Sequence, residues 1–137
     1  MRTLLRPLVY LWAAPTTLLG LLLVGLALLS RGRVARAGGT IEVHGGWGSH
    51  LLQRLMPHGG ADAIALGHIV VGQTSASLDR QREHELVHVR QCERWGPLFI
   101  PAYLCASLWA WTRGGDPYLD NVFEREASGR SGPAARD

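Results

Sequence analysis

Three residues in the segment REHELVHVRQCERWG (82–96) have the types and spacing of a metal site: His84, Glu85 and His88, an HExxH pattern. Residues four apart lie on one face of a helix, one turn apart, so both imidazoles can bind the same metal ion. Glu85 points beside that metal, where a carboxylate can take a proton from a water molecule that the metal activates. Apolar residues flank both histidines, which indicates a partly buried turn whose polar groups need partners. The pattern therefore predicts a zinc site with Glu85 as the general base.

A catalytic zinc site has three protein ligands and one open position, so a third ligand must come from elsewhere in the chain. Glu93 is on the same predicted helix, but it lies about 140° round the helix from His88 and faces away. Glu124, in the segment NVFEREA, comes 36 residues after His88 and is another candidate. Glu126, two positions later and on a different side of its helix, is the alternative ligand.

The order of these motifs, an HExxH helix followed by a glutamate in an E-x-x-A helix, resembles the gluzincin metallopeptidases. The nearest pattern is that of the membrane-associated CAAX prenyl protease type, whose third ligand opens an E-x-x-A-D motif. The matching residues here are Glu124-Arg125-Glu126-Ala127, with Ser128 where that group has Asp. The resemblance covers about residues 60–128 of the chain.

This resemblance implies a minimal zincin-like metallopeptidase of the α+β class, with a short β-sheet, an HExxH helix and a C-terminal helix that bears the third glutamate. The Zn²⁺ ligands would be His84, His88 and Glu124, and the catalytic base would be Glu85. In the E-x-x-A-D group the Asp helps to orient a zinc-binding histidine through a hydrogen bond. The residues expected to replace it are Ser128, Asp120 and Asn121.

The resemblance also indicates where a substrate would bind. In zincins generally, an edge strand beside the active helix holds the substrate backbone in an extended form. Residues 63–71, AIALGHIVV, occupy the corresponding place in this chain, and an edge strand can bind a peptide by strand addition. Oxyanion stabilisation needs a donor near the scissile carbonyl, for which the candidates are Tyr118, Tyr103 and His68. For His68, an ordinary strand histidine is the favoured interpretation.

The elements that must position the HExxH residues can be read from turn and cap residues. The HExxH helix is expected from about Asp79 to Trp95, with Ser77 or Asp79 as its cap and Gly96-Pro97 as its end. Before it, the sequence predicts a strand at 40–44, a short helix at 51–57, and one or two strands at 61–72, broken near Gly67.

An uncharged run from Trp95 to Thr112 separates the two halves of the site. A membrane crossing there would put His88 and Glu124 on opposite sides of a bilayer, so the zinc hypothesis excludes it. The run is expected to form a buried or membrane-apposed helix of about 12 residues, and a plain core helix is the favoured form. The glutamate-bearing helix should then begin after Asp116-Pro117, or later with Asp120 or Asn121 as its cap.

The N-terminal segment from Leu8 to Leu29 has 22 residues without a charge, enough to cross the hydrocarbon core of a bilayer. Two interpretations compete: a retained single-pass anchor, which we favour, and a signal peptide cleaved after Ala37 in the A-x-A segment 35–37. Arginines flank the segment on both sides, with a weak preference for a cytoplasmic catalytic part. The predicted division is anchor and linker at 1–37, metallopeptidase domain at 38–127 and disordered tail at 128–137.

Composition narrows the function classes. All 14 basic residues are Arg, and five of them lie in the first 37 residues, which leaves nine against 11 acidic residues in the rest. The net positive charge therefore comes from the residues that flank the apolar segment. Nucleic-acid binding, which needs a basic surface on the folded domain, is not expected. Cys92 and Cys105 are too few for a disulfide framework and are expected to be buried free thiols. The predicted partners are a membrane and a peptide or protein substrate. The alternative function is a non-catalytic zinc-binding membrane domain derived from the peptidase fold.

Overall fold

The computed structural model describes residues 2–55 and 62–130. Its elements in chain order are α1 (Arg2–Leu29), β1 (Arg33–Ala37), β2 (Thr40–His44), α2 (Gly46–Leu55), β3 (Ala63–Leu66), β4 (Ile69–Gly72), α3 (Ser75–Trp95), the 3₁₀ helix η1 (Gly96–Leu98), α4 (Phe99–Thr112) and α5 (Val122–Arg130). The predicted combination of an N-terminal apolar helix, a short sheet, an HExxH helix and a C-terminal glutamate-bearing helix is confirmed.

The described strands form one sheet in the order β1-β2-β4-β3, with β3 at an edge. β2 and β4 run parallel, while β1 and β3 pair antiparallel with β2 and β4 respectively. Residues 63–72 thus form two strands that turn at Gly67, which is one of the two alternatives that the sequence predicted. The expected edge strand at 63–71 is confirmed only for β3, because β4 pairs with a strand on each side. The linker predicted between the apolar segment and residue 38 is wrong for residues 33–37, because they form β1 and the turn at Gly38-Gly39 pairs β1 with β2 along its length.

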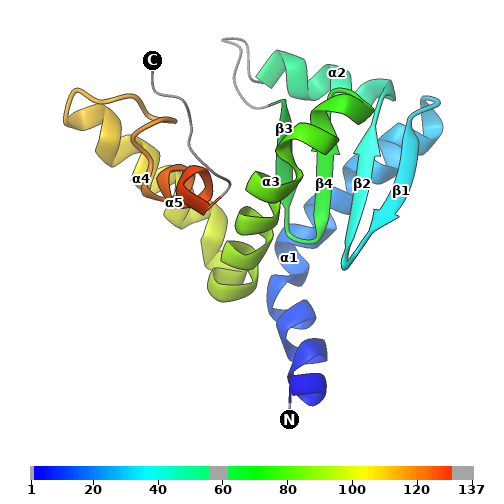
Figure 1. The fold of residues 1–137 in the computed structure, drawn as a ribbon, viewed down its shortest axis with the longest axis horizontal. Helices are drawn as coiled ribbons and strands as arrows, with labels where there is room; N and C mark the ends of the chain where they lie inside the picture. The colour runs from blue at the N-terminus through cyan, green and yellow to red at the C-terminus, as the bar shows by residue number, and fades with distance from the viewer. Residues whose placement is uncertain (1, 56–61, 131–137) are drawn as a thin grey trace.

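The helix α1 covers one face of the sheet, behind it in Figure 1, and α3 covers the opposite face. Ala27 of α1 packs there with Val43, Ile69 and Val71, which come from β2 and β4. The close approach requires Gly20, since a Cβ at that position would collide with the Ile69 side chain. One side of α1 therefore belongs to the fold, while its other side is exposed and apolar.

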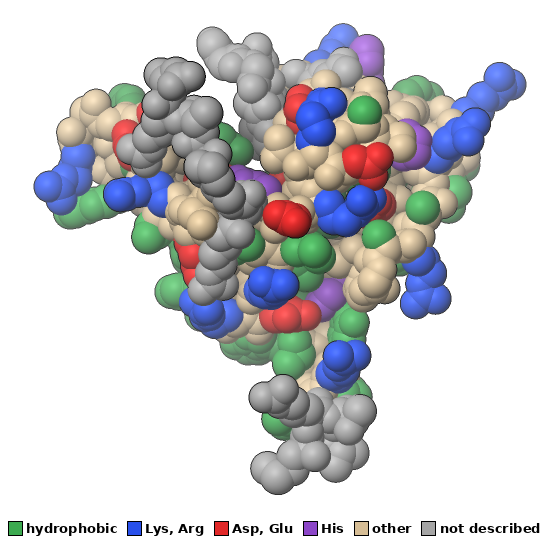
Figure 2. Space-filling view, in the orientation of Figure 1, with side chains coloured by type: hydrophobic (Ala, Val, Ile, Leu, Met, Phe, Trp, Pro, Cys, Tyr) green, Lys and Arg blue, Asp and Glu red, His purple; other side chains and the backbone are tan. Residues whose placement is uncertain are grey.

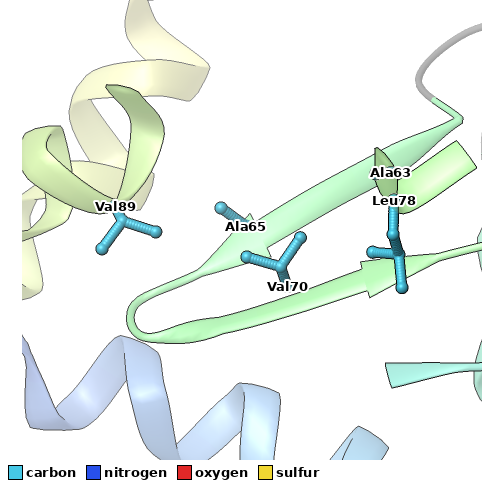
Figure 3. Packing of buried hydrophobic residues seen from close by; sticks show 5 residues of the cluster. All are labelled: Ala63, Ala65, Val70, Leu78 and Val89. Carbon is cyan, nitrogen blue, oxygen red and sulfur yellow. The ribbon is translucent and has the colours of Figure 1, made fainter. Parts of the chain in front are cut away.

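The helix α3 packs its own apolar stripe on the other face of the sheet. Figure 3 shows Leu78 and Val89 of α3 with Ala63, Ala65 and Val70 of the strands. Alternate residues of β4 therefore face the two helices, which is why this central strand reads as a continuous apolar run. A bidentate ion pair adds to the contact, since Arg82 of α3 donates to the buried Glu42 of β2 over 2.8 and 2.9 Å.

Both ends of α3 are set by local backbone chemistry. The predicted caps Ser77 and Asp79 are wrong, because the helix begins at Ser75 and its N-cap is Thr74, the extended residue shortly after β4. Thr74 Oγ1 accepts a hydrogen bond from Ser77 N at 3.1 Å. The predicted end is confirmed: Gly96 has a positive φ of 57° and its N–H donates to Cys92 O.

One further helix boundary differs from the prediction. α2 begins at Gly46, five residues before the predicted start, so the glycine-rich residues 45–50 are largely helical; residues 56–57 lie outside the described part. For α5, which begins at Val122, the predicted later start with Asn121 as its cap is confirmed, because Phe123 N donates to Asn121 Oδ1. The earlier start after Asp116 is wrong, since the Asp116 carboxylate accepts from Tyr118 N and Leu119 N in the preceding turn. Residues 128–130 of the predicted tail belong to α5, and 131–137 are outside the described residues.

The helix α4 leaves the sheet and carries the chain from α3 to α5, at the left of Figure 1. Only Phe99 and Ala110 of α4 are buried, so the favoured prediction of a plain core helix is wrong. Phe99 packs with Cys92 of α3 and Phe123 of α5, and this cluster fixes where the three helices meet. Both cysteines are free, but Cys105 on α4 is exposed, contrary to prediction.

Candidate metal centre

His84, His88 and Glu124 converge on one point between α3 and α5. The Nε2 atoms of the two histidines are 3.1 Å apart. Glu124 Oε2 lies 3.0 Å from His84 Nε2, and Glu124 Oε1 lies 3.2 Å from His88 Nε2. One potential ligand atom from each residue falls within 4.8 Å of the others. The structure thus brings together the three ligands that the sequence predicted.

This set of atoms fits a bound cation. The two Nε2 atoms lie 3.1 Å apart and each also faces an oxygen of the Glu124 carboxylate, so all of these potential ligand atoms border one small volume. Imidazole nitrogen and carboxylate oxygen are common zinc ligands, and three of them leave a position open in a tetrahedral site. The three residues therefore form a candidate metal site in the described part of the chain.

Charge in the cluster favours the ionised form of Glu124. Burial raises the pKa of this carboxyl, but the hydrogen bonds with His84 and His88 outweigh burial and lower the pKa to about 2. For His88, burial acts to lower the pKa, and the hydrogen bond and charge of Glu124 reverse this and raise it. The carboxylate is thus held as an anion among the imidazoles, which is the state that a metal ligand needs.

Glu85 lies beside the three ligands and is almost wholly enclosed, with 3% of its surface exposed. Burial raises the pKa of Glu85 to about 7, against the opposing effect of His88 and His84. One oxygen, Oε2, is a buried atom without a hydrogen-bond partner among the described residues. The Glu85 carboxylate also takes a backbone hydrogen bond from Ala65 of β3. A carboxyl with this pKa can hold or release a proton near neutral pH, as a general base and acid must.

Gln91 fixes the ring of His88. Gln91 is 2% exposed, and its Oε1 lies 2.8 Å from His88 Nδ1. Its Nε2 donates to Phe123 O at 3.1 Å and to Glu126 Oε2 at 2.8 Å, and these two acceptors set the orientation of the amide. His88 Nδ1 must therefore carry the proton, which leaves Nε2 free to bind a metal. The same amide ties α3 to the helix that carries Glu124.

Tyr103 and Asn121 position Glu124 from the other side. Tyr103 donates its hydroxyl hydrogen to Glu124 Oε1 over 2.6 Å. Asn121, fully buried, donates to Tyr103 O and Ser107 Oγ of α4 and accepts from Phe123 N at the start of α5. Asn121 thus acts on the helix that holds the ligand, as its N-terminal cap.

The other predicted site residues lie in different surroundings. Asp120 accepts a hydrogen bond from Asp116 N in the turn before α5, and Ser128 is a half-buried residue of α5. Glu126 holds Gln91 and lies 3.9 Å from Arg94, so it is not one of the three converging ligands. His68 lies with Glu93, which faces away from the site as predicted, and is not an oxyanion donor there.

A cavity of about 250 Å³ opens beside the metal ligands. The edge strand β3 lines the cavity along its whole length, Ala63 to Leu66, and α4 also contributes to the lining. Glu85, His88 and Glu124 form the polar end, and Tyr118 also lines the cavity. Burial, with the charges of Glu124 and Glu85, raises the pKa of Tyr118, so its hydroxyl keeps its proton and can donate a hydrogen bond.

Gln91 is the functional residue that the sequence analysis missed. Its position three residues after His88 places it on the same helical face, which was a usable signal. Glutamine at that spacing is common on ordinary helices, however, and its second set of partners comes from a helix more than 30 residues away.

No family model, curated protein or solved structure matches the chain. The function must therefore be inferred from the site itself.

Proposed function

We propose that the protein is a zinc metallopeptidase anchored to a membrane by α1. The observation that carries the proposal is the convergence of His84, His88 and Glu124 next to the buried Glu85, at the polar end of a cavity edged by β3. This arrangement of an active helix below an edge strand supports a zincin-like site of gluzincin type. The chain would be a minimal version of it.

The substrate would lie along β3 as an added strand. β3 is at the edge of the sheet, so its outer backbone groups can pair with an extended peptide. The cavity next to it is lined mainly by apolar side chains, among them Ile100 and Leu104 of α4. A peptide held there would present one carbonyl to the polar end of the cavity and one side chain to its apolar part.

The chemistry would be shared between the metal and a few side chains. Zn²⁺, when bound, lowers the pKa of water towards about 7 and polarises a carbonyl. Glu85 would accept the proton of the attacking water and pass it to the leaving amine nitrogen. Tyr118 and Tyr103 are the candidates to donate a hydrogen bond to the developing oxyanion, because both line the cavity and both have their hydroxyl next to Glu124.

A non-catalytic zinc domain is the other candidate function. A structural zinc ion is bound by four protein ligands. The donor group found in the described part of the chain has three members, and Glu85 stands beside them with an unpaired oxygen. These observations favour the catalytic function.

The composition of α1 supports anchoring, and its packing on the sheet supports retention of the helix in the chain. Residues Leu5–Leu29 are long and apolar enough to span a membrane or to act as a signal sequence. Cleavage after Ala37 would remove both α1 and β1 and would uncover Val43, Ile69 and Val71 on the sheet. Retention of the helix is therefore part of the proposal, with the catalytic part on the cytoplasmic side.

The test compares wild type with Glu85→Gln, using Glu83→Gln as the matched control because Glu83 is exposed on the same helix. We expect about one zinc ion per chain in all three proteins, by atomic absorption. Cleavage of a mixed peptide library should fall by about 10³-fold or more in Glu85→Gln alone, since the general base and proton carrier is lost. Equal cleavage by Glu85→Gln, or a wild type purified without zinc, would refute the proposal.

A further inference from the structure

The helix α4 has its polar and apolar sides reversed relative to a helix that faces water. Two of its hydroxyl groups point inward: Tyr103 donates to Glu124 Oε1, and Ser107 accepts from Asn121. Apart from Thr112 at its last position, its exposed residues are apolar and recur at helical spacing, namely Pro101, Leu104, Cys105, Leu108, Trp109 and Trp111. In Figure 2, hydrophobic side chains appear at the left of the molecule, in the region of α4, with basic and acidic side chains among them. A surface helix in water normally has the opposite distribution.

The exposed side of α4, which we call the outer α4 face, is unusual in containing no charge. No Asp, Glu, Lys or Arg occurs between Trp95 and Thr112. Contiguous exposed apolar surface of this extent marks an interaction site on a folded protein. A protein interface would carry a polar rim with hydrogen-bonding groups, and the outer α4 face offers few.

Two observations identify the occupant as a lipid bilayer. The first is α1, whose exposed side is also apolar and whose length suits a membrane. Trp12 of α1 packs against Gly96 immediately before α4, so the two apolar surfaces adjoin. The second is the end of α4, where Arg113 lies 5.3 Å from the ring centre of Trp109. Tryptophan with a flanking arginine is typical of residues at headgroup depth.

We propose that the outer α4 face is a second membrane contact, in which α4 lies along the surface of the bilayer with Leu104, Leu108 and Trp109 in its apolar boundary. Its 14 residues span about 21 Å, less than the hydrocarbon core of about 30 Å, so α4 does not cross. α3 and α5, which carry the candidate metal ligands, therefore stay on the same side of the bilayer. Interfacial binding of this kind scales with the apolar area that enters the boundary.

The membrane contact also affects what can enter the cavity, an inference that rests on the proposed function. Leu104 belongs both to the outer α4 face and to the cavity lining. The cavity therefore opens next to the lipid surface. Substrates would be peptide segments presented at the membrane rather than in bulk water.

Cys105 provides a direct test in the full-length chain. It is exposed on the outer α4 face, whereas Cys92 is fully buried and burial raises the pKa of its thiol to about 11, so a thiol-reactive nitroxide labels Cys105 selectively. The protein is placed in phosphatidylcholine–phosphatidylglycerol vesicles, and the label's accessibility to oxygen and to a nickel chelate is measured by spin resonance. The control label is at Glu83→Cys in a Cys105→Ser chain, on the exposed side of α3.

The expected accessibility of the Cys105 label to the nickel chelate is about five- to tenfold below that of the control, because a polar chelate is excluded from hydrocarbon. Equal accessibility at the two positions would overturn the membrane contact. Spin–spin broadening that disappears on dilution with unlabelled chains would also overturn it, in favour of a second copy. The readout involves neither zinc nor hydrolysis, so it can fail or succeed separately from the proposed peptidase activity.

Discussion

In the part of the chain that the structure describes, two clusters pair histidine with a glutamate, and one of the two has the form of a metal site. In the cluster of His84, His88 and Glu124, imidazole and carboxylate lie 3.0 and 3.2 Å apart. In the other, His68 Nε2 lies 3.0 Å from Glu93 Oε1. Distance and residue type are therefore almost the same in both.

The difference lies in where the remaining donor atoms point. The second nitrogen of His68 faces Thr17 Oγ1 at 3.4 Å and its ring lies against Tyr10, so its partners come from α1 and α3. In the metal cluster, two ring nitrogens and both carboxylate oxygens face one another. A histidine–glutamate pair becomes a candidate metal site when a third ligand converges on it, and otherwise it joins elements of the fold.

The largest effect should come from removing a ligand. His88→Ala is expected to lower zinc affinity by about 10³-fold or more, equivalent to about 4 kcal/mol, since one of three protein ligands is lost. His68→Ala is the matched change in the other cluster and should leave zinc affinity within about twofold. Competition with a chromophoric chelator measures both. A similar loss in the two variants would show that the clusters are not functionally different.

The next effect concerns the pH dependence of stability in the metal-free protein. Burial raises the pKa of Glu85 from 4.5 to about 7, so the folded state favours the protonated carboxyl. The stability that the protonated Glu85 contributes is therefore fully present below pH 4.5 and is lost as pH rises through about 7. Glu85→Gln cannot ionise and should keep that stability. We expect the free energy of unfolding of Glu85→Gln to exceed that of wild type by about 3 kcal/mol at pH 8 and to equal it near pH 4.

Denaturant unfolding in detergent with a chelator, at a series of pH values, checks this expectation. Glu83→Gln is the control, because that side chain is exposed and its replacement should leave the curve unchanged. A constant difference between Glu85→Gln and wild type from pH 4 to pH 8 would mean that Glu85 does not titrate in this range. It would then be unsuited to proton transfer.

A smaller effect is expected from Gln91, which the metal cluster has and the His68 cluster lacks. Gln91→Leu removes the acceptor of His88 Nδ1 and should lower zinc affinity by about 10- to 100-fold, because the ring is no longer held in the ligand orientation. Gln81→Leu, ten residues earlier on α3, is the control. Affinity unchanged in Gln91→Leu would assign Gln91 to the packing of α3 on α5 alone.

The sequence predicted the parts of the site that follow from local geometry. The spacing of His84 and His88 fixes their common face on any helix, and Glu124 was identified by its motif. Gln91 could not be assigned in the same way, because its role depends on Phe123 and Glu126 of a distant helix. Hydrogen bonds between helices depend on the angle and position at which the helices pack. The spacing of residues in the sequence does not give that packing.

The secondary structure also divides into features that local sequence predicts and features that depend on contacts between elements. The strands on either side of Gly67 and the end of α3 at Gly96 follow from local turn chemistry, and both were predicted correctly. The strand β1 was missed because its stability comes from pairing with β2, not from its own arginine-rich residues. For α4, apolar composition predicted a helix, but only the structure shows that its polar side faces inward towards Glu124 and Asn121.

The smallest effect should come from the His68 cluster, where a substitution is expected to lower stability without changing zinc binding. His68→Ala removes the contacts with Glu93 and Tyr10 that join α3 to α1, and should lower the free energy of unfolding by about 1 to 2 kcal/mol. Glu93→Gln keeps a hydrogen-bonding group next to His68, and its carboxylate is 37% exposed, so its cost should be below about 1 kcal/mol. Both variants should retain a full zinc content. If His68→Ala instead lost zinc with its stability unchanged, a link between the membrane helix and the metal centre would replace the purely structural interpretation of this pair.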